Sequence, residues 1–230
     1  MNSSEWQAEI SARLSKVEER IQTACQKYGR RREEVTLIAV SKTKPIEAVL
    51  AAHACGQIDF GENYLQDALT KIACLPDSVL TWHFIGHIQS NKCRDIARDF
   101  AWVHTVDRLK IAQRLAKYAP QPVNVLLQVN QSGEPTKSGV TEVQLCGLAE
   151  SVVNTDNIKL RGLMSIPAAS DDFEQQRQVF RQLRTMLEDL NHKGHNLDVL
   201  SMGMTGDFEA AIEEGATIVR VGTAIFGERH

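Results

Sequence analysis

The sequence predicts a single (β/α)8 TIM barrel, in which eight parallel strands alternate with helices, preceded by an extra N-terminal helix. Short apolar runs alternate with longer amphipathic segments about eight times along the chain, which is typical of βαβ units in a parallel sheet. The length of 230 residues suits one such barrel. The runner-up fold class, a doubly wound open sheet, is weakened because neither GxGxxG after the first strand nor GxxxxGK[ST] is present.

The first segment, residues 1–29, predicts an amphipathic helix packed on the barrel. Its apolar residues recur at steps of three and four, which is the helical period; they are Trp6, Ile10, Leu14, Val17, Ile21, Ala24 and Tyr28. Gly29 follows as a residue that commonly ends helices. No Pro/Gly/Ser-rich linker divides the remaining chain, so we expect residues 1–230 to form one domain.

The strands are predicted from short runs rich in Val, Ile and Leu, and the helices from the longer segments between them. In chain order the predicted strands are Val35–Val40, Gln57–Gly61, Thr81–Ile85, Trp102–Thr105, Val123–Val129, Ile158–Leu163, Leu197–Leu200 and Thr217–Val221. The helices predicted after them are Pro45–Ala54, Asn63–Cys74, Gln89–Phe100, Asp107–Tyr118, Thr141–Val153, Asp171–Lys193, Asp207–Glu214 and a turn from Thr223. Pro45 suits a first helical turn, and Asp107 is expected to cap its helix.

The composition excludes several classes of function. Lys plus Arg is 26 and Asp plus Glu is 29, so there is no basic excess for a nucleic-acid partner. No apolar run reaches the roughly 18 residues of a membrane helix, and the N-terminus lacks the pattern of a secretory signal. The five cysteines form no CxxC pair, and His83 and His87 lie in a predicted strand and turn. We therefore expect a cytoplasmic protein with reduced thiols and no metal site.

Two loops predict a phosphate site at the carboxyl ends of the strands, where barrels carry their active sites. The loop 201–207 follows the seventh strand, and Gly222-Thr223 follows the eighth. Both contain glycine next to a hydroxyl residue, which lets backbone N–H groups and hydroxyls approach an anion. The alternative is that each glycine only turns the chain.

Lys42 is the candidate nucleophile, because it directly follows the first strand. A lysine partly desolvated at a barrel mouth can lose its proton and attack a carbonyl. Lys44 competes, but Pro45 forces it into an extended conformation at the start of the helix. Arg220 ends the eighth strand, where it either pairs with a carboxylate or faces a ligand ring. The alternative for Lys42 is a surface lysine.

An amine, a phosphate cradle and an arginine at one barrel mouth suit pyridoxal 5′-phosphate (PLP). Its aldehyde would form a Schiff base with Lys42, and its phosphate would lie on the two loops. Arg220 would meet the pyridine nitrogen, which is a recognised position for an arginine. A cationic partner keeps that nitrogen unprotonated, so the ring becomes a weaker electron sink.

The motifs around these residues resemble those of the pyridoxal phosphate homeostasis protein family, the YggS/PROSC-like proteins. The matching stretches, in order along nearly the whole chain, are AVSKTKP (39–45), FGENY (60–64), WHFIG (82–86), QSNK (89–92), KSG (137–139), RGLM (161–164), LSMGM (200–204) and VRVGTAIFG (219–227). The resemblance implies a barrel similar to the N-terminal domain of alanine racemase, with PLP bound to Lys42. One departure is GMTGDF at 203–208, where the family usually has GMSxDM. Thr205 keeps the hydroxyl there.

The resemblance also implies which other residues bind the cofactor. Ser201, Gly222 and Thr223 would lie near the phosphate, with Thr205 in the same loop, and Arg220 near the ring nitrogen. Asn63, His83 and Met164 would line the same mouth.

The resemblance implies a cofactor carrier rather than an enzyme. We therefore expect a protein that holds, buffers and hands over PLP, with no catalytic residue. A racemase needs a base on each face of its substrate, and related racemases take the second base from another domain. We expect a monomer, with apo forms of PLP-dependent enzymes as candidate recipients. The alternatives are a racemase-like PLP enzyme and a Schiff-base aldolase without cofactor. Lys137 is a candidate secondary aldehyde site.

Overall fold

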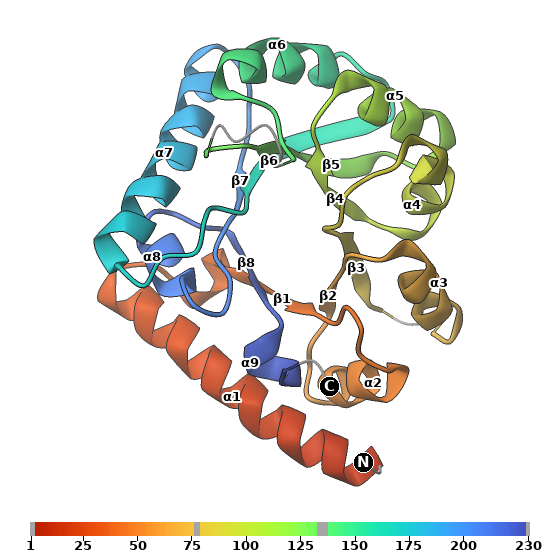
Figure 1. The fold of residues 1–230 in the computed structure, drawn as a ribbon, viewed down its shortest axis with the longest axis vertical. Coiled ribbons are helices and arrows are strands. Elements are labelled where there is room, and N and C mark those ends of the chain that lie inside the picture. Colours follow the sequence, from red (N-terminus) through yellow and green to blue (C-terminus); the bar gives the residue numbers. More distant parts are fainter. Residues whose placement is uncertain (1–2, 76–78, 133–137, 229–230) are drawn as a thin grey trace.

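A computed structural model describes residues 3–75, 79–132 and 138–228 of the chain. Its eight strands form a closed parallel barrel in sequential order, with the eighth strand paired to the first. The helices lie around the outside of the strands (Figure 1). The predicted fold class is confirmed.

The strands are β1 (Thr36–Val40), β2 (Asp59–Glu62), β3 (Thr81–Phe84), β4 (Trp102–Val106), β5 (Val123–Val129), β6 (Ile158–Ser165), β7 (Val199–Ser201) and β8 (Ile218–Val221). The helices are α1 (Ser3–Lys27), α2 (Ile46–Ala54), α3 (Leu65–Ala73), α4 (Cys93–Asp99), α5 (Leu109–Tyr118), α6 (Glu142–Val153), α7 (Phe173–His192), α8 (Phe208–Glu213) and α9 (Thr223–Phe226). Two 3-10 turns, Arg32–Glu34 and Ser90–Lys92, precede β1 and α4.

Three details differ from the sequence-based expectations. Met164 and Ser201 lie within β6 and β7 rather than in the loops after them, because the two residues pair in the sheet and so extend both strands. Asp107 does not cap α5, which begins at Leu109 after Arg108. The Asp107 carboxylate instead accepts a hydrogen bond of 2.8 Å from Arg108.

The barrel has an inner and an outer core, because alternate side chains of a strand point to opposite faces. The outer core lies between strands and helices and is apolar. The apolar part of the inner core consists of Ile38, Val40, Ile85, Leu126, Met164, Val199 and Ile218. Four polar side chains, those of His83, His104, Ser201 and Arg220, are also fully buried. The interior of the barrel is therefore not purely apolar.

Helix α1 packs against α2, α8 and α9 on the outside of the barrel (Figure 1). Its buried face includes Ile10 and Ile21, as the periodicity predicts. On a neighbouring face, the Arg20 guanidinium lies 4.3 Å from the ring centre of Phe208 and forms an ion pair with Glu209. These contacts connect α1 to α8, the helix that follows the predicted phosphate loop.

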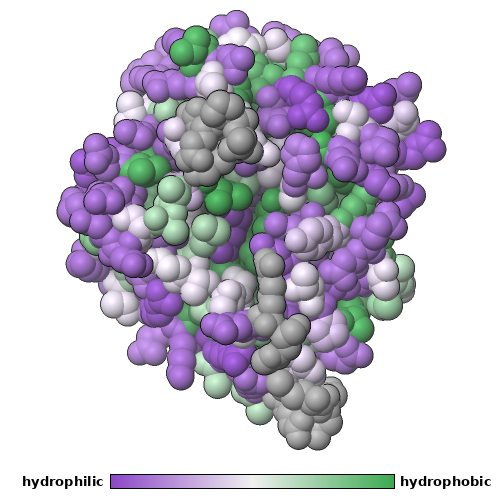
Figure 2. All heavy atoms as spheres, viewed as in Figure 1, coloured by the Kyte–Doolittle hydropathy of each residue, from purple (hydrophilic) through white to green (hydrophobic). Residues whose placement is uncertain are grey.

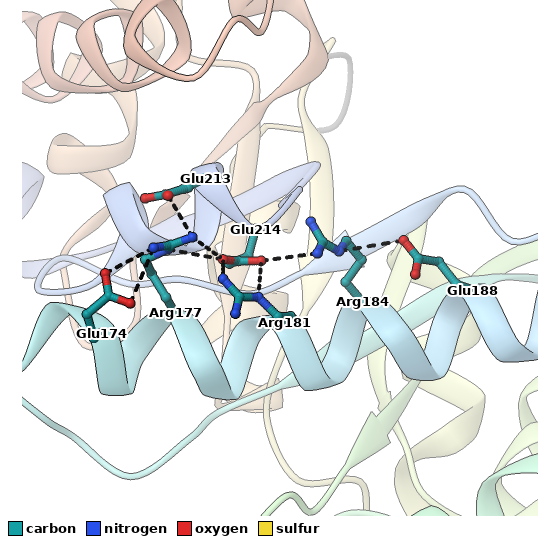
Figure 3. A network of polar contacts seen from close by, with 7 residues as sticks. All are labelled: Glu174, Arg177, Arg181, Arg184, Glu188, Glu213 and Glu214. Atoms are coloured by element: carbon teal, nitrogen blue, oxygen red, sulfur yellow. Dashed lines mark hydrogen bonds and ion pairs between the residues drawn. The ribbon is translucent and has the colours of Figure 1, made fainter.

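Helix α8 is also held by α7, through a buried carboxylate among arginines (Figure 3). Glu214, which is 2% exposed at the end of α8, accepts from Arg177 at 3.0 Å, Arg181 at 2.8 Å and Arg184 at 3.4 Å. Residues three and four apart share a helix face, so one face of α7 presents all three arginines. Burial by itself raises the pKa of Glu214, but the hydrogen bond from Arg181 and the nearby positive charges outweigh it and lower the pKa.

We expect Glu214→Gln to lower the free energy of unfolding by about 1.5–3 kcal/mol at neutral pH, because hydrogen bonds to a charged acceptor are lost. The folded-state pKa of Glu214 is depressed, so this stabilisation is complete above the ordinary glutamate pKa and disappears as the pH falls through the folded value. Urea unfolding across acid pH checks this, with the exposed Glu19→Gln of α1 as control. A difference between variant and native protein that stays constant into acid would contradict it.

None of the described helices is both long and apolar enough to span a membrane. Figure 2 shows one face of the molecule in the orientation of Figure 1. Hydrophilic residues cover most of its periphery, with hydrophobic residues interspersed toward the centre.

Candidate functional site

Lys42 lies at the carboxyl end of β1, half-buried, in a sharply turning segment. Ser41 before it is fully buried, and its N–H donates to the Gly61 carbonyl of β2 at 3.0 Å. Thr43 after it has a φ of 63°, a conformation that is rare and strained for a β-branched residue. Such strain persists only where the surroundings enforce it.

A buried ion pair fixes the backbone before Lys42. The Lys71 ammonium of α3 donates to the Ser41 carbonyl and to Glu62 Oε1, both at 2.8 Å. The Ser41 hydroxyl donates to the same Glu62 oxygen at 2.7 Å. Lys71 is 3% and Glu62 0% exposed. Burial raises the pKa of Glu62, and the Lys71 charge and hydrogen bond only partly oppose that rise.

A second contact fixes the backbone after Lys42. The third hydrogen bond of the Lys71 ammonium goes to Asp67 Oδ2 at 2.8 Å, and that oxygen also accepts from the Thr43 N–H at 3.3 Å. Lys71 therefore holds the peptide groups on both sides of Lys42, directly on one side and through Asp67 on the other. The hydrogen bond from the Thr43 N–H to Asp67 helps to stabilise the unusual φ of Thr43.

The competing lysine points elsewhere. The Lys44 ammonium donates to the Glu228 carbonyl at 2.8 Å, beside the C-terminal end of the described chain. Burial and the nearby Arg13 charge lower the pKa of Lys44. Its amine is thus engaged on the helical side of the structure, next to α1, whereas the strained turn presents Lys42.

Arg220 of β8 reaches the carboxyl ends of the two preceding strands. Its Nη1 donates to Ser201 Oγ at 2.7 Å and its Nη2 donates to the Ser165 carbonyl at 2.8 Å. Burial lowers the pKa of Arg220 to about 10, with partial opposition from the Asp207 carboxylate. The guanidinium therefore still carries its charge at neutral pH.

The site has polar groups whose hydrogen-bonding capacity is unused. In the described chain, no carboxylate lies within ion-pair distance of Arg220, and Asn63 Oδ1 and Ser165 Oγ are buried without a hydrogen-bond partner. Buried polar groups are normally paired, so such groups at a barrel mouth indicate a place for a polar ligand. A ligand with an acceptor for the guanidinium fits this set.

The two glycine loops lie against the strands that carry Lys42 and Arg220. Gly203 has a φ of 92°, its carbonyl accepts from the Arg220 N–H at 3.0 Å, and a Cβ there would lie 2.7 Å from the Ala211 side chain. Only glycine fits that turn. A Cβ on Gly222 would lie 3.3 Å from the Val40 carbonyl, so this loop approaches the backbone two residues before Lys42.

The hydroxyl residues of these loops have different surroundings. Thr223 is exposed at the start of α9. Thr205 is half-buried, and its carbonyl accepts from Arg20 of α1 at 3.3 Å. The Ser201 hydroxyl, expected near the phosphate, is fully buried and hydrogen-bonded to Arg220 and His104.

His83 is the expected mouth residue that comes from the third strand. It lies in the third position of β3, 1% exposed, with hydrogen bonds to His104 and Asp59. Ile85, which follows β3 two residues after His83, belongs to the apolar inner core. Met164 is buried in the inner core, opposite Ser201 in the sheet. The structure thus joins Ser201, Arg220 and His83 through His104, and leaves Thr205 outside that group.

Sequence reasoning missed His104, Asp59, Ser165 and the Glu62–Lys71 pair. The alternation in Trp102-Val103-His104 was a usable signal, because it places His104 on the inner face of β4 beside inward-facing His83 of β3. Lys137 lies outside the described residues. Within the described ranges, no group of three or more His, Cys, Asp or Glu side chains is arranged to hold a metal ion.

Known proteins show which family has this barrel and these motifs. The family model described as alanine racemase, N-terminal domain, matches residues 13–230. A pyridoxal phosphate homeostasis protein of Pseudomonas aeruginosa is 56% identical over 223 residues, which cover 96% of each chain. The chain belongs to the pyridoxal phosphate homeostasis protein family. A member of that family from Escherichia coli is 45% identical over 227 residues, covering 96% of this chain and 97% of its own.

Solved structures agree with the assignment to the pyridoxal phosphate homeostasis protein family. PipY of Synechococcus elongatus, whose structure has PLP bound, is 35% identical with a TM-score of 0.83, covering 95% of this chain and 100% of PipY. An alanine racemase of Clostridium difficile is 15% identical with a TM-score of 0.76, covering 96% of this chain and 57% of the racemase. At that identity the likeness shows the fold alone.

Proposed function

We propose that this protein binds PLP at its barrel mouth and serves to hold and buffer the cofactor in the cell. The observation that carries the proposal is Arg220, a buried, charged guanidinium without a carboxylate partner among the described residues, at the end of the barrel where Lys42 lies. The pyridine nitrogen of PLP would give the Arg220 guanidinium a further hydrogen-bond acceptor. The same ring carries the aldehyde that would react with Lys42.

Lys42 holds the aldehyde in this proposal. The amine attacks the carbonyl carbon, the new C=N bond replaces C=O, and the carbonyl oxygen leaves as water with the two amine protons. Lys71 and Asp67 hold the flanking peptide groups, so the amine stays at the mouth. Arg220 donates to the ring nitrogen. The remaining ligand contacts come from Gly222, Thr223 and Thr205 at the phosphate and from Asn63 and Met164 beside the ring.

The direct test of PLP binding is the visible absorbance of the purified protein. A yellow protein that loses its colour on mixing with an apo-enzyme, while that enzyme gains activity, supports a carrier. Colourless protein that also fails to take up added PLP would contradict the proposal.

The phosphate assignment predicts a difference between two ligands. Thr223→Val removes a hydroxyl that only PLP uses, because pyridoxal has no phosphate. A hydrogen bond to a charged group contributes about 1.5–3 kcal/mol, so we expect about a tenfold to hundredfold weaker binding of PLP and little change for pyridoxal. Absorbance titrations measure both, with exposed Thr70→Val as the control. Equal losses for the two ligands would place the phosphate elsewhere.

The proposed role is storage rather than catalysis. An arginine at the ring nitrogen leaves the ring unprotonated and a weak electron sink, so removal of an α-proton from a bound amino acid is not assisted. We expect no appreciable exchange of the Cα proton in heavy water across a panel of L- and D-amino acids. Nuclear magnetic resonance spectra of the amino acids measure this. Rapid exchange of one of them, abolished in Lys42→Ala, would favour a racemase-like enzyme.

The carrier role also fixes the expected partners. The proposal has PLP as the ligand, apo forms of PLP-dependent enzymes as recipients, and a cytoplasmic monomer of one domain as the working unit. Neither nucleic acid nor a membrane is needed for it.

A further inference from the structure

A chain of hydrogen bonds crosses the barrel interior from Arg220 to Asp59. Arg220 Nη1 lies 2.7 Å from Ser201 Oγ, and that oxygen lies 2.9 Å from His104 Nδ1. His104 Nε2 lies 3.0 Å from His83 Nδ1, and His83 Nε2 lies 3.0 Å from Asp59 Oδ1. Ser201 is the last residue of β7 and Asp59 the first of β2. The chain therefore connects the mouth with the amino ends of the strands.

Both ends of this chain fix its direction. A guanidinium has no acceptor, so the Ser201 hydroxyl must accept from Arg220 and is free to donate its own proton to His104. At the other end the Asp59 carboxylate accepts, so His83 carries its proton on Nε2. If both histidines are neutral, His83 Nδ1 accepts from His104 Nε2–H and His104 Nδ1 accepts from the Ser201 hydroxyl. Every link then runs from Arg220 toward Asp59, with the proton of each histidine on Nε2.

The surroundings support neutral histidines. Burial, the repulsion that a protonated His83 would exert, and the Arg220 charge hold the pKa of His104 well below its ordinary value. Burial lowers the pKa of His83, against the opposing effect of Asp59. The ring of Trp102 stacks on His83 at 5.7 Å and 15°, which fixes the plane of that imidazole. The chain is thus preorganised rather than a set of freely rotating groups.

We propose that Asp59, His83 and His104 are positioning residues for Arg220. Through Ser201 they fix the guanidinium, and the Asp59 carboxylate supplies the negative end of the hydrogen-bond chain for a buried cation that has no carboxylate within ion-pair distance among the described residues. The N–H groups of Arg220 beyond its two bonds are thereby held toward the ring nitrogen of the ligand. This inference rests on the proposed function.

Two properties distinguish positioning from mere filling of the barrel. A structural plug stabilises the fold and affects all ligands alike. A positioning chain affects specifically the preference for a ligand with a ring nitrogen over one without it. The probe is therefore a pair of ligands, PLP and its analogue in which a C–H group replaces the ring nitrogen.

The experiment measures binding of both ligands to the native protein, Asp59→Asn, His104→Phe and the exposed control His192→Gln. We expect the native protein and the control to bind PLP about tenfold or more tightly than the analogue. The analogue binds more weakly because it leaves the charged Arg220 donor without an acceptor. His104→Phe should reduce that preference to near one, and Asp59→Asn should reduce it severalfold. Asp59 is at the barrel end with its side chain 29% exposed, so its variant tests the proposal even if His104→Phe does not fold.

The outcomes separate the two proposals. Equal affinity of the native protein for both ligands would overturn the ring-nitrogen contact of Arg220, and with it this part of the proposed function. A native preference for PLP that both variants retain would overturn the positioning role and leave the proposed function standing. Nitrogen-15 spectra of histidine-labelled native protein provide a second measurement. Neutral Nε2–H forms of His83 and His104 are expected, and a cation or an Nδ1–H form of His104 would contradict the chain.

Discussion

Replacing Lys42 with alanine is expected to abolish covalent PLP binding and the visible absorbance that accompanies it, with the fold unchanged. The reason is positional, since Lys42 is the lysine that the strained turn after β1 presents, between two peptide groups held by Lys71 and Asp67. Lys44 lies in the same turn but donates to Glu228 on the side of α1. The measurements are an absorbance spectrum after PLP addition and a far-ultraviolet circular dichroism spectrum.

The matched control is Lys44→Ala, which should keep the absorbance of the native protein. Residual noncovalent binding by Lys42→Ala is compatible with the account, because Arg220 and the phosphate loops remain. An unchanged visible spectrum of Lys42→Ala would show that another lysine carries the aldehyde.

Replacing Lys71 with methionine is expected to have the largest effect on stability. It leaves the fully buried Glu62 without its cation, and removal of one partner of a buried ion pair costs about 3–5 kcal/mol. It also releases the Ser41 carbonyl and Asp67. Urea unfolding should show that loss, and PLP titration should show weaker binding because Lys42 loses its support.

Two further variants test this interpretation. The exposed Lys110→Met of α5 should leave both stability and PLP binding near native values. The double variant Lys71→Met/Glu62→Gln should recover part of the stability, because it removes the unpaired buried charge. If Lys71→Met has the same free energy of unfolding as the native protein, the ion pair does not stabilise the turn that contains Lys42.

The barrel was predictable because each strand is marked by a short apolar run in its own stretch of sequence. The run Val123–Val129 coincides with β5 to the residue, because its Val and Leu residues include members of both the outer and the inner core, as in a buried parallel strand. Strand ends were less predictable. β6 reaches Ser165 because Ser165 pairs with Val129 of β5 and Met164 pairs with Ser201 of β7, and both partners are distant in the sequence.

Within the site, Lys42 and Arg220 were accessible from the sequence because each follows or ends an apolar strand. The contacts that hold them were not. Lys71 lies on the helix after β2, and its partners are Ser41 and Glu62 at two different strand ends. His83 matched a motif, but its burial and its bond to His104 depend on which strands become neighbours and on which face each side chain takes.

The central claim is that PLP is held covalently on Lys42, and residue-level mapping tests it most directly. The purified protein is loaded with PLP, reduced with borohydride to make the bond permanent, digested and analysed by tandem mass spectrometry. We expect stoichiometric labelling of Lys42 with a phosphopyridoxyl group. Every other lysine should carry the group at substoichiometric amounts or not at all. Stoichiometric labelling of a different lysine, with Lys42 unmodified, would contradict it.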